Sequence, residues 1–201
     1  KDRLPVSIAK MSTGSPQGFE SPGKLAVGKF KNQKMTIADF DHFDLTRKKE
    51  LLFSCCGSDA WVKSMLGIFP VNDLVDLLEY AEEKWFECSP AEWLEAFHHH
   101  PRIGDPESLQ KKAAGTPEFA TGEQAEVTKA APPLLEELAK ANEEYEENFG
   151  YLFIVFATGK TAGDILDILK KRVHNDPHDE LLIAAGEQNK ITQLRLQKLF
   201  V

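Results

Sequence analysis

The sequence predicts an all-α protein, folded as a single irregular bundle of about seven to nine helices with an N-terminal tail. Apolar residues recur at steps of three and four from residue 35 almost to the end of the chain, which is typical of amphipathic helices. Residues that start and stop helices divide this pattern into segments of helical length. The composition, 42% hydrophobic and 28% charged residues in a chain of 201, is that of a globular protein with a sizeable core.

Residues 1–34 differ from the rest of the chain. They contain Pro5, Pro16 and Pro22 among glycines and clusters of serine and lysine, without a sustained helical or strand period. We therefore expect residues 1–34 to be a tail or linker and residues 35–201 to form the helical domain.

Two helices are expected before residue 101. The apolar stripe of the first consists of Val71, Leu74, Val75, Leu78, Ala81 and Trp85. Ser89 and Pro90 then supply an N-cap and a proline at the first helical position, with Glu92 as the third helical residue. This short second helix should stop near His100, because Pro101 disfavours helical dihedral angles in the residue before it.

A long helix is expected after residue 120. The sequence Thr121-Gly122-Glu123-Gln124 has the T-x-x-Q form of a capping box, which opens helices. Pro132 and Pro133 should kink or divide this helix, and its second part should run to about Asn148.

The C-terminal part of the chain contains a short apolar segment and two more helices. Periodicity does not decide whether residues 149–156 form a buried extended segment or a buried turn of helix. The next helix is marked by Ile165, Leu166, Ile168, Leu169 and Val173, and it is ended by Asn175-Asp176-Pro177. The last helix carries Leu181, Leu182, Ile191, Leu194 and Leu199.

The charge and the cysteines limit the class of partner. A net charge of −8 argues against nucleic acid or an anionic membrane surface, which need clustered Lys and Arg. No run of 18 apolar residues predicts a membrane span. A small anionic substrate stays possible, since one local cation can bind it.

The cysteines and the N-terminus indicate the compartment. Cys55, Cys56 and Cys88 form no disulfide or metal pattern, and the N-terminus lacks the features of a secretory signal, so we expect free thiols and a cytoplasmic location.

Three consecutive histidines, His98, His99 and His100, precede Pro101. Successive helical residues point about 100° apart, so the three cannot easily share one ion, and the i, i+4 spacing of helical metal sites is absent. The sequence therefore predicts no metal site. Surface or capping roles are the ordinary interpretation of His98 and His99. His100 lies where the helix ends, so its ring can face a cleft and the helix C-terminus favours its protonated form.

Two charged residues are further candidates for function. Glu123 lies in the first turn of an expected helix, where the helix dipole stabilises an acid that has no other role. Arg195 lies near the middle of the apolar stripe of the last helix, four residues from both Ile191 and Leu199. A buried ion pair or a side chain that reaches the surface would explain this arginine, and so would a cation lining a ligand pocket.

Four stretches of the chain resemble the OHCU decarboxylases, where OHCU is 2-oxo-4-hydroxy-4-carboxy-5-ureidoimidazoline. They are residues 96–104 (AFHHHPRIG), Glu123-Gln124, residues 148–154 (NFGYLFI) and residues 191–196 (ITQLRL). The stretches occur in matching order, and the resemblance covers about residues 35–201.

This resemblance implies a reaction in urate degradation, the removal of CO2 from OHCU to give (S)-allantoin. The enzymes of the family are all-helical, usually homodimeric, and use neither metal nor organic cofactor. The resemblance identifies His100 as the catalytic acid and base, with Glu123 and Arg195 orienting and stabilising the substrate. The substrate contacts that it implies are Pro101, Ala120, Thr121, Gly122, Gln124, Phe153, Ile154, Val155, Phe156 and Ala157.

Two positions depart from the family pattern. Leu152 stands where the apolar segment usually has proline, and Thr158 stands where an arginine is often found. Two other classes of protein also stay open. One is a non-enzymatic helical interaction module in which Arg195 forms a structural ion pair. The other is a metal-binding protein that uses residues 98–100 with a nearby acid such as Asp105.

Overall fold

The structure, a computed structural model, describes residues 35–104, 123 and 126–200. Within these residues it contains eight α-helices and no strand, which confirms the predicted all-α fold. In chain order they are α1 (Ile37–Asp41), α2 (Leu45–Cys56), α3 (Asp59–Leu66), α4 (Leu74–Phe86), α5 (Pro90–His98), α7 (Pro132–Phe149), α8 (Ala162–Arg172) and α9 (Pro177–Leu199), with a short 3-10 helix (Val127–Lys129) before α7. The predicted tail, residues 1–34, lies outside the described residues, and the predicted helix start at residues 121–124 lies outside them except for Glu123.

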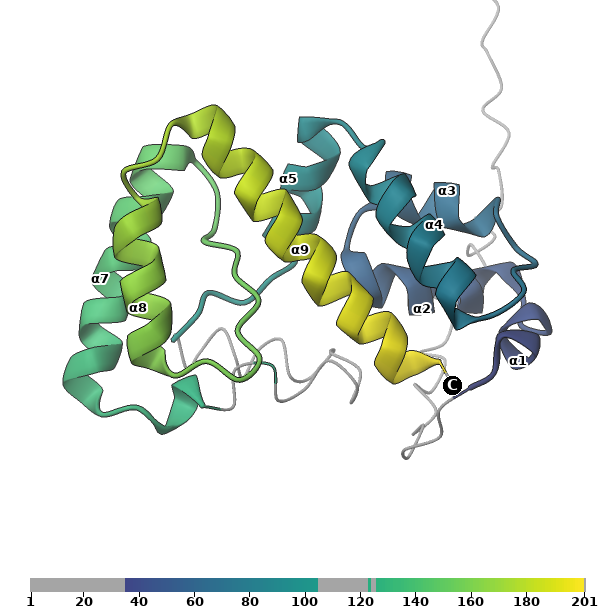
Figure 1. Cartoon of the computed structure of the whole chain (residues 1–201), viewed down its shortest axis with the longest axis horizontal. Helices are drawn as coiled ribbons and strands as arrows, with labels where there is room; N and C mark the ends of the chain where they lie inside the picture. The colour runs from purple at the N-terminus through teal and green to yellow at the C-terminus, as the bar shows by residue number, and fades with distance from the viewer. Residues whose placement is uncertain (1–34, 105–122, 124–125, 201) are drawn as a thin grey trace, which may run out of the picture. The chain divides into compact units, whose positions relative to one another are not determined.

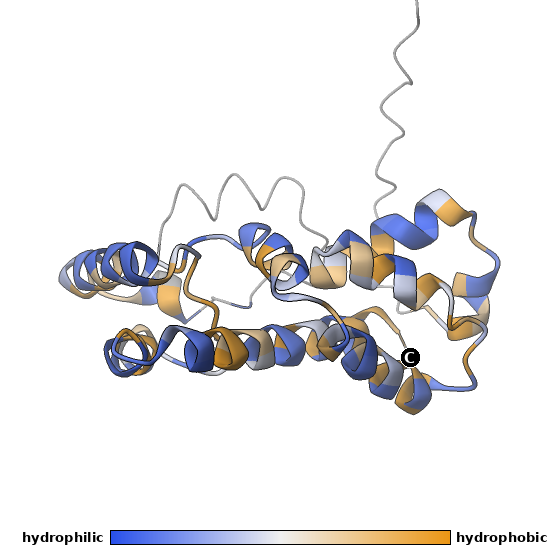
Figure 2. Cartoon of the chain, turned by 90° about the horizontal axis from the view of Figure 1, so that it is seen from above, coloured by the Kyte–Doolittle hydropathy of each residue, from blue (hydrophilic) through white to orange (hydrophobic). Residues whose placement is uncertain are grey.

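The long helix α9 contacts several of the other helices (Figure 1). It packs against α2, α4 and α5, while α7 and α8 pack against each other. In Figure 1, α9 runs between the α7–α8 pair on one side and helices α2 to α5 on the other. Figure 2 shows polar and apolar residues on the same helices, as expected where each helix buries one face. Helix α9 is therefore placed to bring residues from distant parts of the chain together.

Three tryptophans join the helices around α4. Each is buried and donates its indole N–H to a main-chain oxygen. The donor–acceptor pairs are Trp61 with Ala81 at 2.9 Å, Trp85 with Ala185 at 2.8 Å and Trp93 with Trp85 at 2.9 Å. A buried indole N–H without an acceptor would cost about 1–3 kcal/mol. These bonds therefore favour one register of α3, α5 and α9 on α4.

The buried face of α4 differs from the predicted stripe at two positions, since Val75 is exposed and Leu77, which the stripe left out, is fully buried. Asp73 caps the helix by accepting hydrogen bonds from the second and third helical N–H groups. From this start, Leu77, Ala81 and Trp85 follow at steps of four and are fully buried. Val75 was predicted to lie on this face and is 62% exposed, because two helical positions turn it about 200° away from the buried Leu77.

Local start signals position α5 and α7. The predicted start of α5 is confirmed, with Ser89 as N-cap and Pro90 as the first helical residue. The carboxylate of Glu92, the third helical residue, accepts hydrogen bonds from the N–H and the hydroxyl of Ser89 at 2.7 and 2.9 Å. Pro132 and Pro133 occupy the first turn of α7 and begin the helix, with Ala131 as its N-cap. This helix is the second part that the sequence predicts after a division at the prolines, and it ends at Phe149, next to the predicted Asn148. Proline is tolerated at its start because the first-turn N–H groups that proline lacks have no helical acceptor anyway. The predicted first part lies partly outside the described residues, and Val127–Lys129 form a 3-10 helix.

The apolar segment after α7 is buried and extended. Helix α7 ends at Phe149, and Gly150 follows with a left-handed φ of +77°. Residues 152–157 then run without helical or strand hydrogen bonding, and Phe153, Ile154 and Val155 are buried. Of the two alternatives that periodicity left open, the extended one is found.

Residues from the two ends of the described region lie side by side. The N–H of Met35 donates to the carbonyl of Leu199 at 3.1 Å, and Met35 forms a parallel bridge with Phe200. Both side chains of the bridge are buried. None of the helices in the described region has the length and apolarity needed to cross a membrane.

Candidate active site

A pocket between the loop that follows α5, helix α9 and the extended segment contains most of the predicted site residues. Its lining residues are His100, Pro101, Ile103, Glu123, Phe153, Ile154, Val155, Phe156, Ala157, Thr158, Ile191 and Leu194. Predicted residues Ala120, Thr121, Gly122 and Gln124 lie outside the described part of the chain. Sequence reasoning did not predict four of the lining residues as contacts: Ile103, Thr158, Ile191 and Leu194. Of these, Ile103, Ile191 and Leu194 belong to stretches that resemble the family.

The end of α5 turns the three histidines toward different neighbours. His98 is exposed, and its Nδ1 lies 2.6 Å from the carbonyl oxygen of Leu94. The ring of His99 packs edge-on against Phe53 at 4.9 Å. His100, partly buried, lines the pocket. In the described region no three or more His, Cys, Asp or Glu residues are grouped as metal ligands would be.

His100 is bonded to a buried glutamine that the sequence analysis did not single out. Its Nε2 lies 2.5 Å from Oε1 of Gln188 on α9. The Gln188 side-chain nitrogen in turn donates to the Thr192 hydroxyl at 3.1 Å and to the Cys56 carbonyl at 3.4 Å. A signal was present in the sequence, since Gln188 lies one turn before Ile191 and shares its face of the helix.

Arg195 and Glu123 form an ion pair at the pocket. Arg195 donates from Nε and Nη2 to the two carboxylate oxygens of Glu123, both at 2.8 Å. The side chains are only 12% and 17% exposed. The second amino group, Nη1, faces the carbonyl oxygens of Ser54 and Cys55 at 3.5 and 3.3 Å. These carbonyls belong to the last turn of α2, whose negative dipole end attracts a cation.

The charge on Arg195 is stabilised by this arrangement. Burial opposes the charge, but the hydrogen bonds and the negative charge of Glu123 outweigh it and raise the pKa of the guanidinium above its usual value. Burial raises the pKa of the neighbouring Cys55 thiol to about 12. The arginine is therefore a fixed cation beside a neutral thiol.

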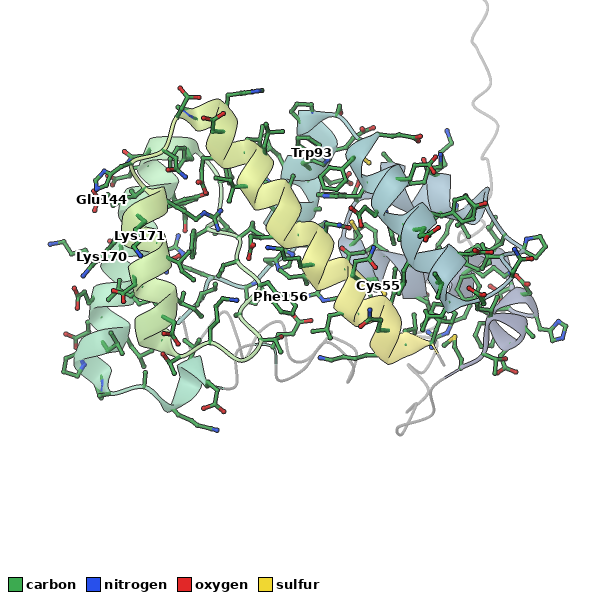
Figure 3. All side chains as sticks on the ribbon, in the orientation of Figure 1. Cys55, Trp93, Glu144, Phe156, Lys170 and Lys171 are labelled. Atoms are coloured by element: carbon green, nitrogen blue, oxygen red, sulfur yellow. The ribbon has the colours of Figure 1, made fainter. Side chains whose placement is uncertain are left out.

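Three charged side chains hold the main chain of the extended segment. Arg172 Nη1 donates to the carbonyl of Ile154 at 2.8 Å. At Phe156, the N–H donates to the Glu187 carboxylate at 2.7 Å and the carbonyl accepts from Lys160 at 2.6 Å. Figure 3 shows Phe156 on this segment beside α9. With these polar groups bonded, the segment presents an apolar wall to the pocket.

A buried charged cluster lies behind the same segment. Glu180 is fully buried and accepts hydrogen bonds from Arg172, Tyr145 and Asn175. The guanidinium of Arg172 also lies 4.7 Å from the centre of the Phe153 ring. Sequence analysis missed this cluster, because a glutamate near a helix start is already explained by the helix dipole.

The arrangement suits acid–base chemistry on a small, flat and polar molecule. An imidazole lies at one side of the pocket, a carboxylate held by an arginine at another, and apolar side chains form the rest of the wall. Such a site can move a proton and can hold N–H groups or developing negative charge where water is largely excluded.

Comparison with known proteins gives one consistent family. The family model described as OHCU decarboxylase matches residues 42–197. The uric acid degradation bifunctional protein TTL of Arabidopsis thaliana is 37% identical over 147 residues, which cover 73% of this chain and 45% of that protein. The 2-oxo-4-hydroxy-4-carboxy-5-ureidoimidazoline decarboxylase of Halalkalicoccus jeotgali is 23% identical over 174 residues, or 84% of this chain and 93% of that protein. The chain thus spans less than half the length of the bifunctional relative.

Two solved structures resemble the fold. A crystal structure of OHCU decarboxylase in the presence of (S)-allantoin has a TM-score of 0.64 and 37% sequence identity, covering 75% of this chain and 97% of that one. A crystal structure of (S)-allantoin synthase has a TM-score of 0.62 at 16% identity, covering 83% of this chain and 54% of that one, and supports the fold alone.

Proposed function

Because this chain belongs to the OHCU decarboxylase family, we propose that it removes CO2 from OHCU and delivers (S)-allantoin in urate degradation. The observation that carries the proposal is the pocket in which His100 and Glu123 face an apolar wall, with Arg195 bonded to Glu123. The site residues, the cofactor-free reaction and the cytoplasmic location that the sequence predicts belong to this proposal.

The reaction needs proton transfers that His100 is placed to perform. When the carboxylate leaves as CO2, the electron pair of the broken C–C bond enters the conjugated ring of the substrate. A ring nitrogen that receives this pair takes up a proton from solvent. The substrate hydroxyl then loses its proton as it becomes a carbonyl, and the neighbouring ring carbon gains one. An imidazole next to the substrate can accept the hydroxyl proton and can return one, as general acid–base catalysis requires. Protonation of one face of the ring within a shaped pocket would give a single enantiomer.

Glu123 and Arg195 would act on the substrate as a unit. The Glu123 carboxylate lines the pocket and can accept hydrogen bonds from the ureido N–H groups. Arg195 fixes the orientation of that carboxylate and places a positive charge near the oxygens on which negative charge develops. Pro101 and residues 153–157 would enclose the ring, with Ile191 and Leu194 of α9 opposite them.

The experiment that tests the proposal is circular dichroism of enzymatically generated OHCU with and without this protein, which reports both the rate and the handedness of the product. His100→Ala should reduce the formation of (S)-allantoin by about 10²–10⁴-fold, the usual contribution of a general acid–base residue. His98→Ala and His99→Ala are matched controls, since neither side chain lines the pocket. Full activity in all three variants would remove the acid–base role from His100.

The other two classes of function predict different results. A metal-dependent reaction would be lost with EDTA and recovered with zinc, whereas we expect EDTA to leave the activity unchanged. A non-enzymatic interaction module would not change the spectrum of OHCU at any protein concentration.

The homodimer is also part of the proposal. Large apolar side chains are exposed on α4 and α9, among them Phe86, Leu182 and Ile183 at 48%, 46% and 41%. Burying such side chains against a second copy would stabilise a dimer. Light scattering coupled to size-exclusion chromatography should give twice the monomer mass, and a monomer at all concentrations would contradict the proposal.

A further inference from the structure

Gln188 stands in an unusual position for a glutamine. Its side chain is fully buried on α9, and the structure gives all three of its hydrogen bonds to named partners. One side of the amide faces the His100 ring, and the other faces the Thr192 hydroxyl and the main chain at the end of α2. A polar group that is buried and bonded in this way is held in one orientation.

The partners determine which end of the amide faces His100. The Cys56 carbonyl can only accept a hydrogen bond, so the NH2 group of Gln188 must be the end that faces it. The amide oxygen is then the end that faces His100 at 2.5 Å. Because an amide oxygen can only accept, Nε2 of His100 must carry the proton in this bond.

We propose that Gln188 is a positioning residue that holds His100 in the tautomer with the proton on Nε2. A neutral imidazole has one N–H and one basic nitrogen, so this tautomer makes Nδ1 the nitrogen that accepts a proton. The assignment of Nδ1 as the atom that exchanges a proton with the substrate rests on the proposed decarboxylation. The tautomer itself does not depend on it.

A neutral acceptor has a specific consequence for the charge of His100. A carboxylate at position 188 would favour the imidazolium and could not donate to Cys56, whereas an amide orients the ring without adding charge. Of the described residues, the charged groups at this pocket are the Glu123 carboxylate, which lines it, and the Arg195 guanidinium bonded to that carboxylate. These two charges are paired with each other, whereas the contact from Gln188 to the His100 ring is neutral.

The test is nitrogen-15 NMR of the full chain labelled at histidine, recorded above the pH at which the His100 ring becomes neutral. The His100 signals are those missing from the His100→Ala variant. We expect the pattern of the Nε2–H tautomer, with a basic Nδ1. In Gln188→Met, which has similar length but no acceptor, the signals should shift toward a mixture of tautomers, and kcat should fall about 10- to 100-fold with little change in KM.

Two further variants separate orientation from packing. Gln188→Glu keeps the acceptor and adds a negative charge, so the acidic limb of the pH–rate profile should move to higher pH. Thr192→Val removes one partner of the amide nitrogen but leaves the bond to His100, so the tautomer should be unchanged.

The outcomes are distinguishable. An Nδ1–H pattern in the unmodified protein would overturn the proposal without any variant having to fold. An unchanged tautomer in Gln188→Met would overturn it as well. If the unmodified protein shows the Nε2–H pattern and Gln188→Met alters it, while OHCU is not decarboxylated at all, the proposed function fails and the tautomer assignment stands.

Discussion

Arg195 and Glu123 meet through two parallel hydrogen bonds, Nε to Oε1 and Nη2 to Oε2, both 2.8 Å long. This fork geometry holds the carboxylate in the plane of the guanidinium, which a single contact would not do. The same arginine reaches the last carbonyls of α2 with its third nitrogen. The pair therefore links the pocket to α2 and α9, so that a change in this pair should alter both the charge at the pocket and the stability of the fold.

Removing one member of this ion pair should lower the free energy of unfolding. Arg195→Met leaves the Glu123 carboxylate without its partner at a site that is mostly closed to water, and we expect a loss of about 3 kcal/mol in the free energy of unfolding. The double variant Arg195→Met with Glu123→Met should lose less than the sum of the single changes. Urea unfolding of the four proteins measures the coupling, and additive losses would show that the two side chains act independently.

The cluster around Glu180 should support the extended segment. Glu180→Gln removes the negative charge that faces Arg172, in a site with no access to water, and should cost about 3 kcal/mol. Because Arg172 also holds the Ile154 carbonyl, the pocket wall should loosen and KM for OHCU should rise.

The matched control is the exposed ion pair between Lys170 and Glu137, which joins α8 to α7. Glu137→Gln should leave the free energy of unfolding nearly unchanged, since exposed pairs contribute little. Equal losses in the free energy of unfolding at positions 137 and 180 would mean that burial does not set the strength of the pair between Arg172 and Glu180.

The contribution of Glu187 should depend on pH. Burial opposes its charge, but the hydrogen bonds from Lys190 and from the N–H of Phe156 outweigh burial and hold the pKa of the carboxyl below its usual value. A lowered folded pKa gives stability that is present above the unfolded pKa, about 4.5, and is lost as pH falls through the folded value. Glu187→Gln should thus cost about 1–2 kcal/mol at pH 7 and much less near pH 3.

Thermal unfolding of both proteins between pH 3 and pH 7 measures this difference. The exposed Glu79 on α4 supplies the control substitution, Glu79→Gln. A constant gap between the Glu187→Gln variant and the unmodified protein across this range would mean that the carboxylate charge does not contribute.

Truncation tests the predicted domain boundary. A chain that starts at Met35 keeps the hydrogen bond to Leu199 and the bridge to Phe200, so we expect it to fold and to remain active. A chain that starts at Ile37 loses these contacts and the Thr36 cap of α1, and should melt at a lower temperature. An insoluble protein starting at Met35, or one without a cooperative melt, would place part of residues 1–34 in the core.

Features that depend on a few adjacent residues could be predicted from the sequence. Ser89 and Glu92 bond to each other across the first turn and Pro90 lies between them, so their spacing alone predicts the start of α5. Proline in a helical pattern has two meanings, because the missing N–H interrupts a helix in its middle and is tolerated at its start. The sequence therefore predicted a boundary at Pro132 but left open whether the prolines kink a helix or divide it, and the structure shows that a helix begins there.

Contacts between distant residues could not be predicted in this way. His100 and Gln188 are 88 positions apart, and no periodicity relates them. For Arg195 on its apolar stripe, the sequence left open a buried ion pair, a side chain that reaches the surface and a ligand contact. The structure shows an ion pair, and the partner is Glu123, which lines the pocket.

Helix α9 bears Glu180, Glu187, Gln188 and Arg195, each of which holds a different part of the molecule in place. Each residue of an α-helix is turned about 100° from the one before it. One residue inserted or deleted between Glu187 and Arg195 would therefore turn Arg195 away from its partners while Glu187 stayed in place. The helix thus fixes the positions of these four side chains relative to one another, and none can be moved along it independently. Homologous proteins with this site should vary in the length of their loops, and in α9 they should differ by substitution alone.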